Sequence, residues 1–325
     1  MTDRRSKPLC AFCGDQLSMK LTGDVGRDGK TYDVYFCQKC FIGITSPLPS
    51  LKELTTLYSS EGYRAASGVK FNELLERLIY LFRLRRKKLI KKYIGRGRIL
   101  DIGCGRGLFL TIMKNDGWTV TGTEFNEGTA SYASRAYGID VKTGNPSEWG
   151  FPEESFDVIT INHALEHLRN PAEILGTCSR LLRKGGLLVI AVPNISSLQA
   201  AAGKSAWFHL DIPYHLYHFS EEGLAGLLEK SSFHISRIRR FDLEYGPFGW
   251  LQTLLNLSGI RNNLFYNLLK NPELRKTEIA KARRTDVILT VILLPVYFPL
   301  SFVFSLFESF ILKRGGATEI YAVKE

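Results

Sequence analysis

The stretch LDIGCGRGLFL (100–110) decides the fold of this chain of 325 residues. It reads as a buried strand that ends at Asp101, a turn that contains Gly103, Gly105 and Gly107, and the start of a helix. Glycine suits such a turn because it adopts positive φ without strain and lets a ligand approach the backbone. The free N–H groups at the start of the following helix can bind a polar group of that ligand. The stretch therefore predicts a ligand-binding strand–turn–helix unit.

Strands and helices alternate around this unit, which predicts an α/β fold with a doubly wound, mostly parallel sheet. The expected strands are 98–103, 118–124, 156–162, 186–193, 234–242 and 318–324. The expected helices between them are 107–115, 126–137 and 171–183. Hydrophobic residues make up 45% of the chain and charged residues 23%, with a mean hydropathy of −0.06. These values exclude disordered, collagen-like and many-span membrane proteins.

The spacing of the glycines and one carboxylate indicate which ligand binds. The glycines follow G-x-G-x-G, whereas the dinucleotide fingerprint is G-x-G-x-x-G. Glu124 ends the next expected strand, where a carboxylate can accept hydrogen bonds from both hydroxyls of a ribose. A dinucleotide-binding dehydrogenase or epimerase domain is the alternative interpretation of the glycine turn.

Several motifs in the same order resemble the class I S-adenosylmethionine-dependent methyltransferases, over about residues 71–243 and again at 318–324. The motifs are LDIGCGRG, Glu124-Phe125, GNPSEWGFPEESFDVITINHALEHLRNP (144–171) and LLRKGGLLVIAVPN (181–194). The resemblance implies a seven-stranded Rossmann-like methyltransferase sheet. It also implies that S-adenosylmethionine is the cofactor.

The resemblance assigns roles to the residues around the glycine turn. Asp101 anchors the amino-acid end of the cofactor, Glu124 holds the ribose and Phe125 flanks the adenine. Asn145 stands where the family more often has an aspartate that contacts the adenine amino group, and its carbonyl oxygen can still accept that hydrogen bond. The expected cofactor-binding residues are Asp101, Gly103, Gly105, Gly107, Glu124, Phe125, Asn145 and Asn162.

Histidines are the candidate catalytic bases, because a hydroxyl or carbon acceptor must lose a proton as it is methylated. His163 and His167 follow the expected strand 156–162 one helical turn apart, and the resemblance places them beside the methyl group. The alternative is that they pack or bond to the backbone. Two histidines at this spacing also suit a metal ion, but the sequence shows no third ligand.

A second histidine-rich stretch, WFHLDIPYHLYHFSEEGL (207–224), resembles the substrate-side segment of small-molecule methyltransferases. It makes Tyr214, His215 and His218 the candidate acceptor pocket. The alternative is an aromatic lid that only excludes water.

Four cysteines form two Cys-x-x-Cys pairs near the N-terminus, at Cys10, Cys13, Cys37 and Cys40. This spacing predicts a zinc ribbon over residues 1–45, and four protein ligands make its zinc structural. A redox role is the alternative. Because MTDRRSKPL lacks the apolar core of a signal peptide, we expect a cytoplasmic location in which the thiols stay reduced.

The remaining chain divides into a connecting region and a large domain. Residues 46–97 are expected to form a linker and amphipathic helices, and residues 98–325 the methyltransferase domain, with a hydrophobic helical insertion at 244–316. The insertion ends in the apolar segment 287–312, which is long enough to span a bilayer.

Two prolines, Pro295 and Pro299, are expected to interrupt this apolar segment. If 318–324 pairs in the same sheet as 234–242, both ends of the segment lie on one side of any membrane. A single span is then excluded, which leaves a shallow hairpin, an interfacial helix pair, or a cap buried within the chain or in a homodimer.

The net charge of +11, from 43 Lys and Arg against 32 Asp and Glu, predicts an anionic partner. The basic residues concentrate in 83–98 and in RKTEIAKARR (275–284), and Lys313-Arg314 follows the apolar segment. We therefore expect a peripheral protein on the inner face of the cytoplasmic membrane. Its acceptor is expected to be a small molecule or lipid-linked, of polyprenyl, glycan-lipid or quinone type.

Two other functions remain open at this point. An RNA methyltransferase would use the zinc ribbon and the basic helix to hold nucleic acid. A non-catalytic scaffold would keep the fold without the chemistry, but the intact glycine turn and Glu124 argue against it.

Overall fold

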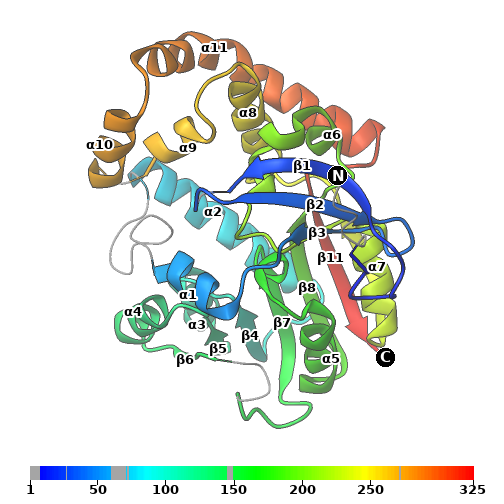
Figure 1. Cartoon of the computed structure of the whole chain (residues 1–325). Coiled ribbons are helices and arrows are strands. Elements are labelled where there is room, and N and C mark those ends of the chain that lie inside the picture. The colour runs from blue at the N-terminus through cyan, green and yellow to red at the C-terminus, as the bar shows by residue number, and fades with distance from the viewer. Residues whose placement is uncertain (1–7, 27, 60–70, 72, 145–148, 271) are drawn as a thin grey trace.

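A seven-stranded sheet forms the centre of the computed structural model, which describes residues 8–26, 28–59, 71, 73–144, 149–270 and 272–325 (Figure 1). The strands are β4 (Arg98–Ile102), β5 (Thr119–Thr123), β6 (Asp140–Lys142), β7 (Phe156–Asn162), β8 (Leu182–Pro193), β10 (Phe233–Arg239) and β11 (Ala317–Lys324). Their order is β10-β11-β8-β7-β4-β5-β6. β11 runs opposite to the other six strands of this sheet, which are parallel to one another. The predicted doubly wound, mostly parallel α/β sheet is thereby confirmed.

Alternate residues of the central strands bury opposite faces of the sheet, as the two-residue period of a strand requires. Ile99 and Val158 pack in one core with helices α2 (Glu73–Ile90) and α3 (Leu108–Asn115). Leu100 and Ile159 pack in the other core. The helices there are α5 (Pro171–Leu181) and α7 (Glu221–Lys230). Helix α4 (Glu127–Tyr137) connects β5 to β6.

A second sheet contains the N-terminal residues and one strand from the large domain. Its strands are β1 (Ser18–Val25), β2 (Thr31–Cys37), β3 (Ile42–Ser46) and β9 (Tyr217–Phe219), followed along the N-terminal chain by α1 (Leu51–Ser59). β3 pairs antiparallel with β9, and Ile42 opposes Phe219. Ile42 and Phe219 also belong to the core that covers the α5 face of the central sheet. The cysteine-rich region is therefore packed into the large domain, a connection that the sequence did not predict.

Helices fill the insertion between β10 and β11. They are α8 (Gly246–Leu257), α9 (Leu264–Leu268), α10 (Pro272–Lys281), α11 (Arg284–Leu306) and the π-helical turn Phe307–Ile311. The expected interruption at Pro295 and Pro299 is wrong, because α11 continues through both prolines. Each proline removes one N–H donor, but apolar helical turns flank both prolines and the helix packs along α8.

The end of this long helix is fastened to the domain by a buried carboxylate. Glu308 is fully buried and accepts hydrogen bonds from the backbone N–H groups of Gln199 (3.1 Å) and Gly316 (2.9 Å). Gln199 lies in α6 (Leu198–Gly203), and Gly316 leads into β11. β11 pairs with β10, so both ends of the insertion return to the same sheet, as expected.

Candidate functional site

The glycine turn after β4 adopts the conformation for which glycine was predicted. Gly103, Gly105 and Gly107 have φ of 75°, 56° and 77°. A Cβ atom on Gly103 would lie 2.5 Å from the Cβ of Ala164, which follows β7. Both the left-handed backbone and the close approach of Ala164 therefore require glycine at position 103.

Two carboxylates from adjacent strands border this turn. Asp101 is buried and accepts a hydrogen bond from Thr160 Oγ1 at 2.6 Å. Burial raises the pKa of Asp101 to about 6. Glu124 follows β5 and accepts from the backbone N–H of Gly105 (3.0 Å) and of Asn126 (3.1 Å). Glu124 thus holds the glycine turn against the end of β5.

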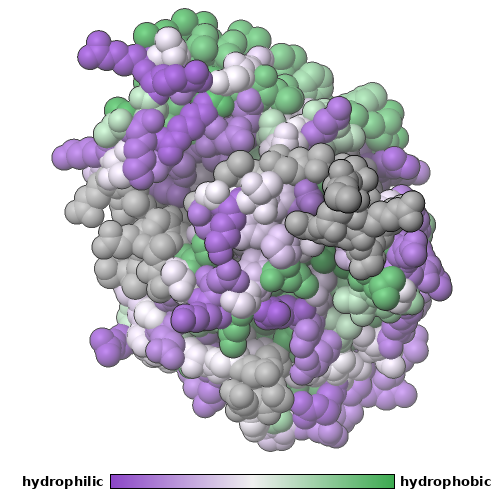
Figure 2. Space-filling view, in the orientation of Figure 1, coloured by the Kyte–Doolittle hydropathy of each residue, from purple (hydrophilic) through white to green (hydrophobic). Residues whose placement is uncertain are grey.

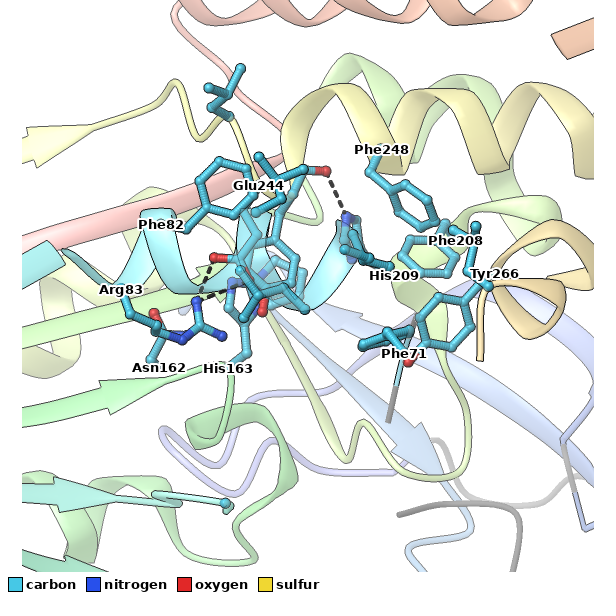
Figure 3. Close-up of a pocket in the computed structure, with 18 of the residues that line it drawn as sticks. Phe71, Phe82, Arg83, Asn162, His163, Phe208, His209, Glu244, Phe248 and Tyr266 are labelled. Atoms are coloured by element: carbon cyan, nitrogen blue, oxygen red, sulfur yellow. Dashed lines mark hydrogen bonds and ion pairs between the residues drawn. The ribbon is translucent and has the colours of Figure 1, made fainter. Parts of the chain in front are cut away.

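A cavity of about 650 Å³ opens beside the turn, a size typical of small-molecule sites (Figure 3). The backbone of the glycine turn lines the cavity near the sheet, at Gly103 and Gly105. The polar and titratable side chains there are those of Asp101, Arg106, Thr129, Asn162, His163, Glu166, His167 and His215. Aromatic side chains gather on the other side, where Phe208, Phe248 and Tyr266 lie together in Figure 3. The far wall includes Phe298 and Phe302 of α11. One cavity therefore connects the glycine turn to the apolar helix.

The structure brings many of the residues that the sequence singled out to this cavity, but two of the three acceptor-pocket candidates are absent from its lining. Tyr214 is buried, and its carbonyl oxygen accepts from His167 Nδ1 at 2.9 Å. His218 is also buried and lies 2.9 Å, Nε2 to Oγ1, from Thr45. The Tyr214 carbonyl therefore holds the ring of His167, a lining residue, whereas His218 contacts the N-terminal region.

Three of the expected cofactor residues are likewise absent from the lining. Gly107 is the N-cap residue of α3, Glu124 holds the turn from outside, and Phe125 is 42% exposed beside it. Asn145 lies outside the described residues.

The residue that sequence reasoning missed is Glu166, in the short 3₁₀ turn Leu165–His167. Its side chain is 1% exposed, and its Oε1 lies 3.5 Å from His163 Nδ1 and 3.9 Å from His215 Nε2. Burial opposes ionisation, but the close His163 ring and the charges of His167 and His215 lower the pKa of Glu166 to about 2. An acid between two histidines just after a central strand was the available signal.

The neighbouring histidines differ in environment. His163 has φ of 48°, an unusual backbone for a non-glycine residue, and its ring lies 3.8 Å from that of Tyr245 between centroids. His209 is fully enclosed, and burial lowers its pKa to about 3, so it is neutral near pH 7. Burial also raises the pKa of Tyr245. His163 therefore has a strained backbone conformation, and its ring packs closely against the tilted ring of Tyr245 at the cavity.

Helix α2 closes the side of the cavity through ion pairs. Arg83 Nη1 lies 3.0 and 2.7 Å from the two carboxylate oxygens of Glu244. Further along the helix, Lys87 and Lys91 lie 3.0 and 2.7 Å from the carboxylate of Asp116. Much of the basic charge predicted at 83–98 is therefore paired within the protein.

The four N-terminal cysteines lie together, with all four Sγ atoms within 4.8 Å of one another. Cys10 Sγ accepts from the backbone N–H of Phe12 (3.4 Å), and Cys37 Sγ accepts from that of Cys40 (3.3 Å). Four sulfurs at this spacing fit a tetrahedral thiolate site for zinc.

Comparisons with known proteins agree with this geometry. A family model described as a methyltransferase domain matches residues 72–237. A probable S-adenosylmethionine-dependent methyltransferase of Mycolicibacterium smegmatis is 27% identical over 150 residues, which cover 46% of this chain and 56% of that protein. A ubiquinone biosynthesis O-methyltransferase of Rhizobium leguminosarum is 36% identical over 110 residues, which cover 32% of this chain and 43% of that protein.

A solved structure, of an S-adenosylmethionine-dependent methyltransferase from Archaeoglobus fulgidus, is 24% identical to this chain. The superposition covers 75% of this chain and 93% of that one, with a TM-score of 0.48. The chain spans about half the length of the two sequence relatives, 56% and 43%.

The close approach at the glycine turn generates a stability prediction. Gly103→Ala is expected to lower the free energy of unfolding by about 2 kcal/mol or more, because it combines a left-handed φ with a steric clash against Ala164. The matched control is Gly176→Ala in α5, where an added Cβ meets nothing within 4 Å and helix propensity favours alanine. Denaturant unfolding of both variants measures the difference. Equal stability of the two variants would contradict this description of the turn.

Proposed function

The chain belongs to the family of methyltransferase domains, and on that basis we propose that it transfers a methyl group from S-adenosylmethionine to a lipid-linked acceptor at a membrane surface. The observation that carries the proposal is the single cavity that joins the glycine turn to the apolar helix α11. We expect the acceptor to be of polyprenyl, glycan-lipid or quinone type. The relatedness to a ubiquinone biosynthesis O-methyltransferase favours the quinone type.

The end of the cavity at the glycine turn suits the cofactor, which supplies a methyl group on a sulfonium. Gly103 and Gly105 have no side chains, so a ligand in the cavity can approach their backbone. The buried carboxyl group of Asp101 lies beside this turn. Glu124 lies one strand away and accepts from the Gly105 N–H, and we propose that it also binds the ribose hydroxyls. Because methyl transfer is an in-line displacement, the main task of these residues is to hold the cofactor in position.

The opposite end of the cavity suits an apolar acceptor. Phe208, Phe248 and Tyr266 contact one another edge to face, with centroids 5.4 to 6.2 Å apart. Phe298 and Phe302 extend the apolar wall onto α11. A chain of methylene or isoprenoid units would bury its surface here at about 25 cal/mol per Å².

A proton acceptor stands between the two ends. His163 Nδ1 faces Glu166 Oε1 at 3.5 Å, which favours a proton on Nδ1. The other ring nitrogen, Nε2, is buried and has no hydrogen-bond partner among the described residues. A base oriented by a carboxylate in this way is suited to take the proton from an acceptor hydroxyl.

Helix α11 supports the membrane location because many of its apolar residues are exposed, whereas several of its polar residues are buried. Thr290, Ser301 and Ser305 are buried, whereas Ile292 and Val303 are 60% and 57% exposed. Figure 2 shows hydrophobic residues gathered along the upper edge of the molecule, where α11 lies in Figure 1. Length and composition would allow one described helix, Arg284–Ile311, to cross a bilayer. Since both ends return to one sheet, we propose instead that it lies in the interface.

Basic residues flank both ends of this helix. Exposed cations are Lys276, Lys281 and Arg284 before the apolar face, and Lys313 and Arg314 after it. They suit anionic headgroups at the inner face of the cytoplasmic membrane. The structure gives less support to RNA as the substrate. Arg83, Lys87 and Lys91 of the basic segment 83–98 are paired with carboxylates of the chain itself, so their charges are less available to bind phosphates.

We propose further that the four cysteines bind a structural zinc. The support is the cluster of four sulfurs with two backbone N–H donors described above. β3, which follows Cys40, pairs with β9 in the histidine-rich segment. The zinc module would therefore stabilise the wall of the cavity.

Cofactor binding is tested at Glu124. We expect Glu124→Ala to weaken S-adenosylmethionine binding at least about tenfold in calorimetry, because hydrogen bonds to a charged group contribute about 1.5–3 kcal/mol. Glu124→Gln should give a smaller loss, since it keeps an acceptor oxygen. Glu127→Ala, which removes an exposed acid in the next helix, is the matched control. Unchanged affinity in Glu124→Ala would refute the assignment.

Membrane binding is tested by sedimentation with vesicles of phosphatidylcholine alone or mixed with phosphatidylglycerol. The wild type should bind the anionic vesicles more strongly. The double variant Ile292→Glu, Val303→Glu should bind at least about tenfold less, since each apolar side chain contributes roughly 1.5–3 kcal/mol when buried. Leu9→Glu, at a position 64% exposed in the N-terminal region, should bind as the wild type does. Equal binding by all three proteins, or by none, would remove the membrane proposal.

Zinc binding is tested by metal analysis of freshly reduced protein. Cys37→Ser is expected to contain one zinc per chain fewer than the wild type and to unfold at a lower temperature, because the site loses a buried ligand. Cys178→Ala, at an equally buried cysteine in α5, should keep the wild-type zinc content. The same zinc content in both variants would show that the cysteines hold no metal.

A further inference from the structure

The apolar end of the cavity lies between helix α2 and helix α11. Both helices contribute side chains to its lining, which include those of Leu75, Ile79 and Phe82 from α2 and of Phe298 and Phe302 from α11. The titratable groups of the glycine turn and the histidines line the opposite end, near the sheet. A ligand that spans the cavity therefore has its polar part near the sheet and its apolar part between the two helices.

Three apolar lining residues mark the place where this cavity meets the surface. Leu78 of α2 is 43% exposed, Phe298 of α11 is 54% exposed, and Leu243, between β10 and α8, is 42% exposed. Two other lining residues, Phe109 and Leu251, are each only 3% exposed and lie deeper. We therefore place the mouth of the cavity among Leu78, Leu243 and Phe298, and we call these three residues the rim.

Exposed apolar residues continue from the rim onto the outer surface of both helices. On α2, Leu74 and Leu81 lie four residues before and three residues after Leu78, so the three side chains share one face of the helix. Leu74 and Leu81 are 80% and 58% exposed. On α11, Val291 lies about two helical turns before Phe298 and is also exposed. A contiguous apolar patch of this kind marks an interaction site, whereas a single exposed leucine would not.

The volume of the cavity limits how much of a lipid can lie inside it. Its 650 Å³ falls within the range of about 300–1,000 Å³ that is typical of sites for one small molecule. Under the proposed function, S-adenosylmethionine takes up the end at the glycine turn. The remaining space suits the reacting group of an acceptor but not a long hydrocarbon chain. The chain must then leave the cavity at the rim, between Leu78 and Phe298.

The charges beside the mouth favour a membrane as the surroundings of this chain. Phe71, just before α2, forms a β-bridge with Lys270, so the start of α2 lies beside the connection from α9 to α10. Helix α10 carries the exposed cations Lys276 and Lys281. An apolar patch bordered by cations is complementary to a leaflet with anionic headgroups and a hydrocarbon interior.

We propose that the gap between α2 and α11 is a lateral portal, through which the acceptor enters the cavity directly from the membrane. The reacting group passes the rim first and reaches His163, while the chain stays between the two helices and among the lipid tails. The apolar surface of the chain is then never exposed to water. This inference rests on the proposed function and adds to it a second membrane-contacting element, the face of α2 that contains Leu74, Leu78 and Leu81.

The first test places one tryptophan on each helix and measures its quenching by vesicles of phosphatidylcholine and phosphatidylglycerol whose acyl chains carry bromine. The four native tryptophans are buried, so the wild-type signal can be subtracted. Leu81→Trp and Val291→Trp should each lose at least about half of the added fluorescence, because interfacial helices bury their apolar face roughly 5–10 Å into the boundary of the acyl chains. Leu9→Trp, at an exposed position of the N-terminal region, should lose none.

The second test measures entry of a chain at the rim without vesicles. The probe is a long-chain bromoalkanol below the concentration at which it forms micelles. We expect it to quench Leu78→Trp saturably and Leu9→Trp only in proportion to its concentration, because the rim holds the chain whereas the N-terminal position meets it by collision. Quenching of Leu78→Trp that resembles that of Leu9→Trp would overturn the entry route.

The outcomes separate this inference from the proposed function. Quenching of Val291→Trp but not of Leu81→Trp by the vesicles rejects the portal and keeps α11 in the membrane. Quenching of neither rejects the membrane location and the portal together, while S-adenosylmethionine binding is decided independently at Glu124. Equal quenching of both and of Leu9→Trp also rejects the portal. Circular dichroism establishes that each variant is folded, and Leu74→Trp replaces Leu81→Trp if the latter is not.

Discussion

Parallel pairing of β4 with β5 and β7 is the constraint on which the site depends, because it brings the ends of three strands to one edge of the sheet. Each of these strands delivers one carboxylate to that edge: Asp101, Glu124 and Glu166. Their environments differ. Asp101 is buried beside a hydroxyl donor, Glu124 accepts from two backbone N–H groups, and Glu166 faces histidines. Asp101 and Glu166, at the same edge of the sheet, thus acquire pKa values shifted in opposite directions.

Residues of the insertion form the wall of the cavity opposite this edge of the sheet. Helix α8 is attached through buried polar contacts, such as the bond from the Phe208 N–H to Thr253 Oγ1 at 3.1 Å. α11 packs along α8 through apolar residues such as Leu293 and Leu294 and also buries Ser301 and Ser305, while further apolar residues on its other side stay exposed. Glu308 holds the far end of α11 through two backbone N–H donors. The fold therefore keeps an apolar surface of α11 exposed, and the same helix contributes both to the cavity wall and to the outer surface.

The sequence predicted the parts of the molecule in which a local pattern carries the structure. The strand, glycine turn and helix at 100–110 follow from glycine conformation and apolar spacing, and the two Cys-x-x-Cys pairs are local turns. The continuity of α11 through Pro295 and Pro299 was not predictable in this way, because packing against α8 outweighs the local cost of proline. Glu166 was missed for a related reason. Its importance comes from His215, which lies 49 residues further along the chain and meets it only after folding.

The pairing of β3 with β9 shows how distant segments determine the site together. Thr45 follows the cysteine cluster and donates from Oγ1 to the carbonyl of His215 at 2.7 Å. With its only proton used in this bond, Thr45 Oγ1 must accept from His218 Nε2, 2.9 Å away. His215 is thus fixed at its carbonyl by Thr45 and at its ring by the carbonyl of His209. Any loosening of the cysteine cluster would release one of these two restraints, so the N-terminal region contributes to the position of an imidazole in the cavity wall, although none of its described residues 8–26 and 28–59 lines the cavity.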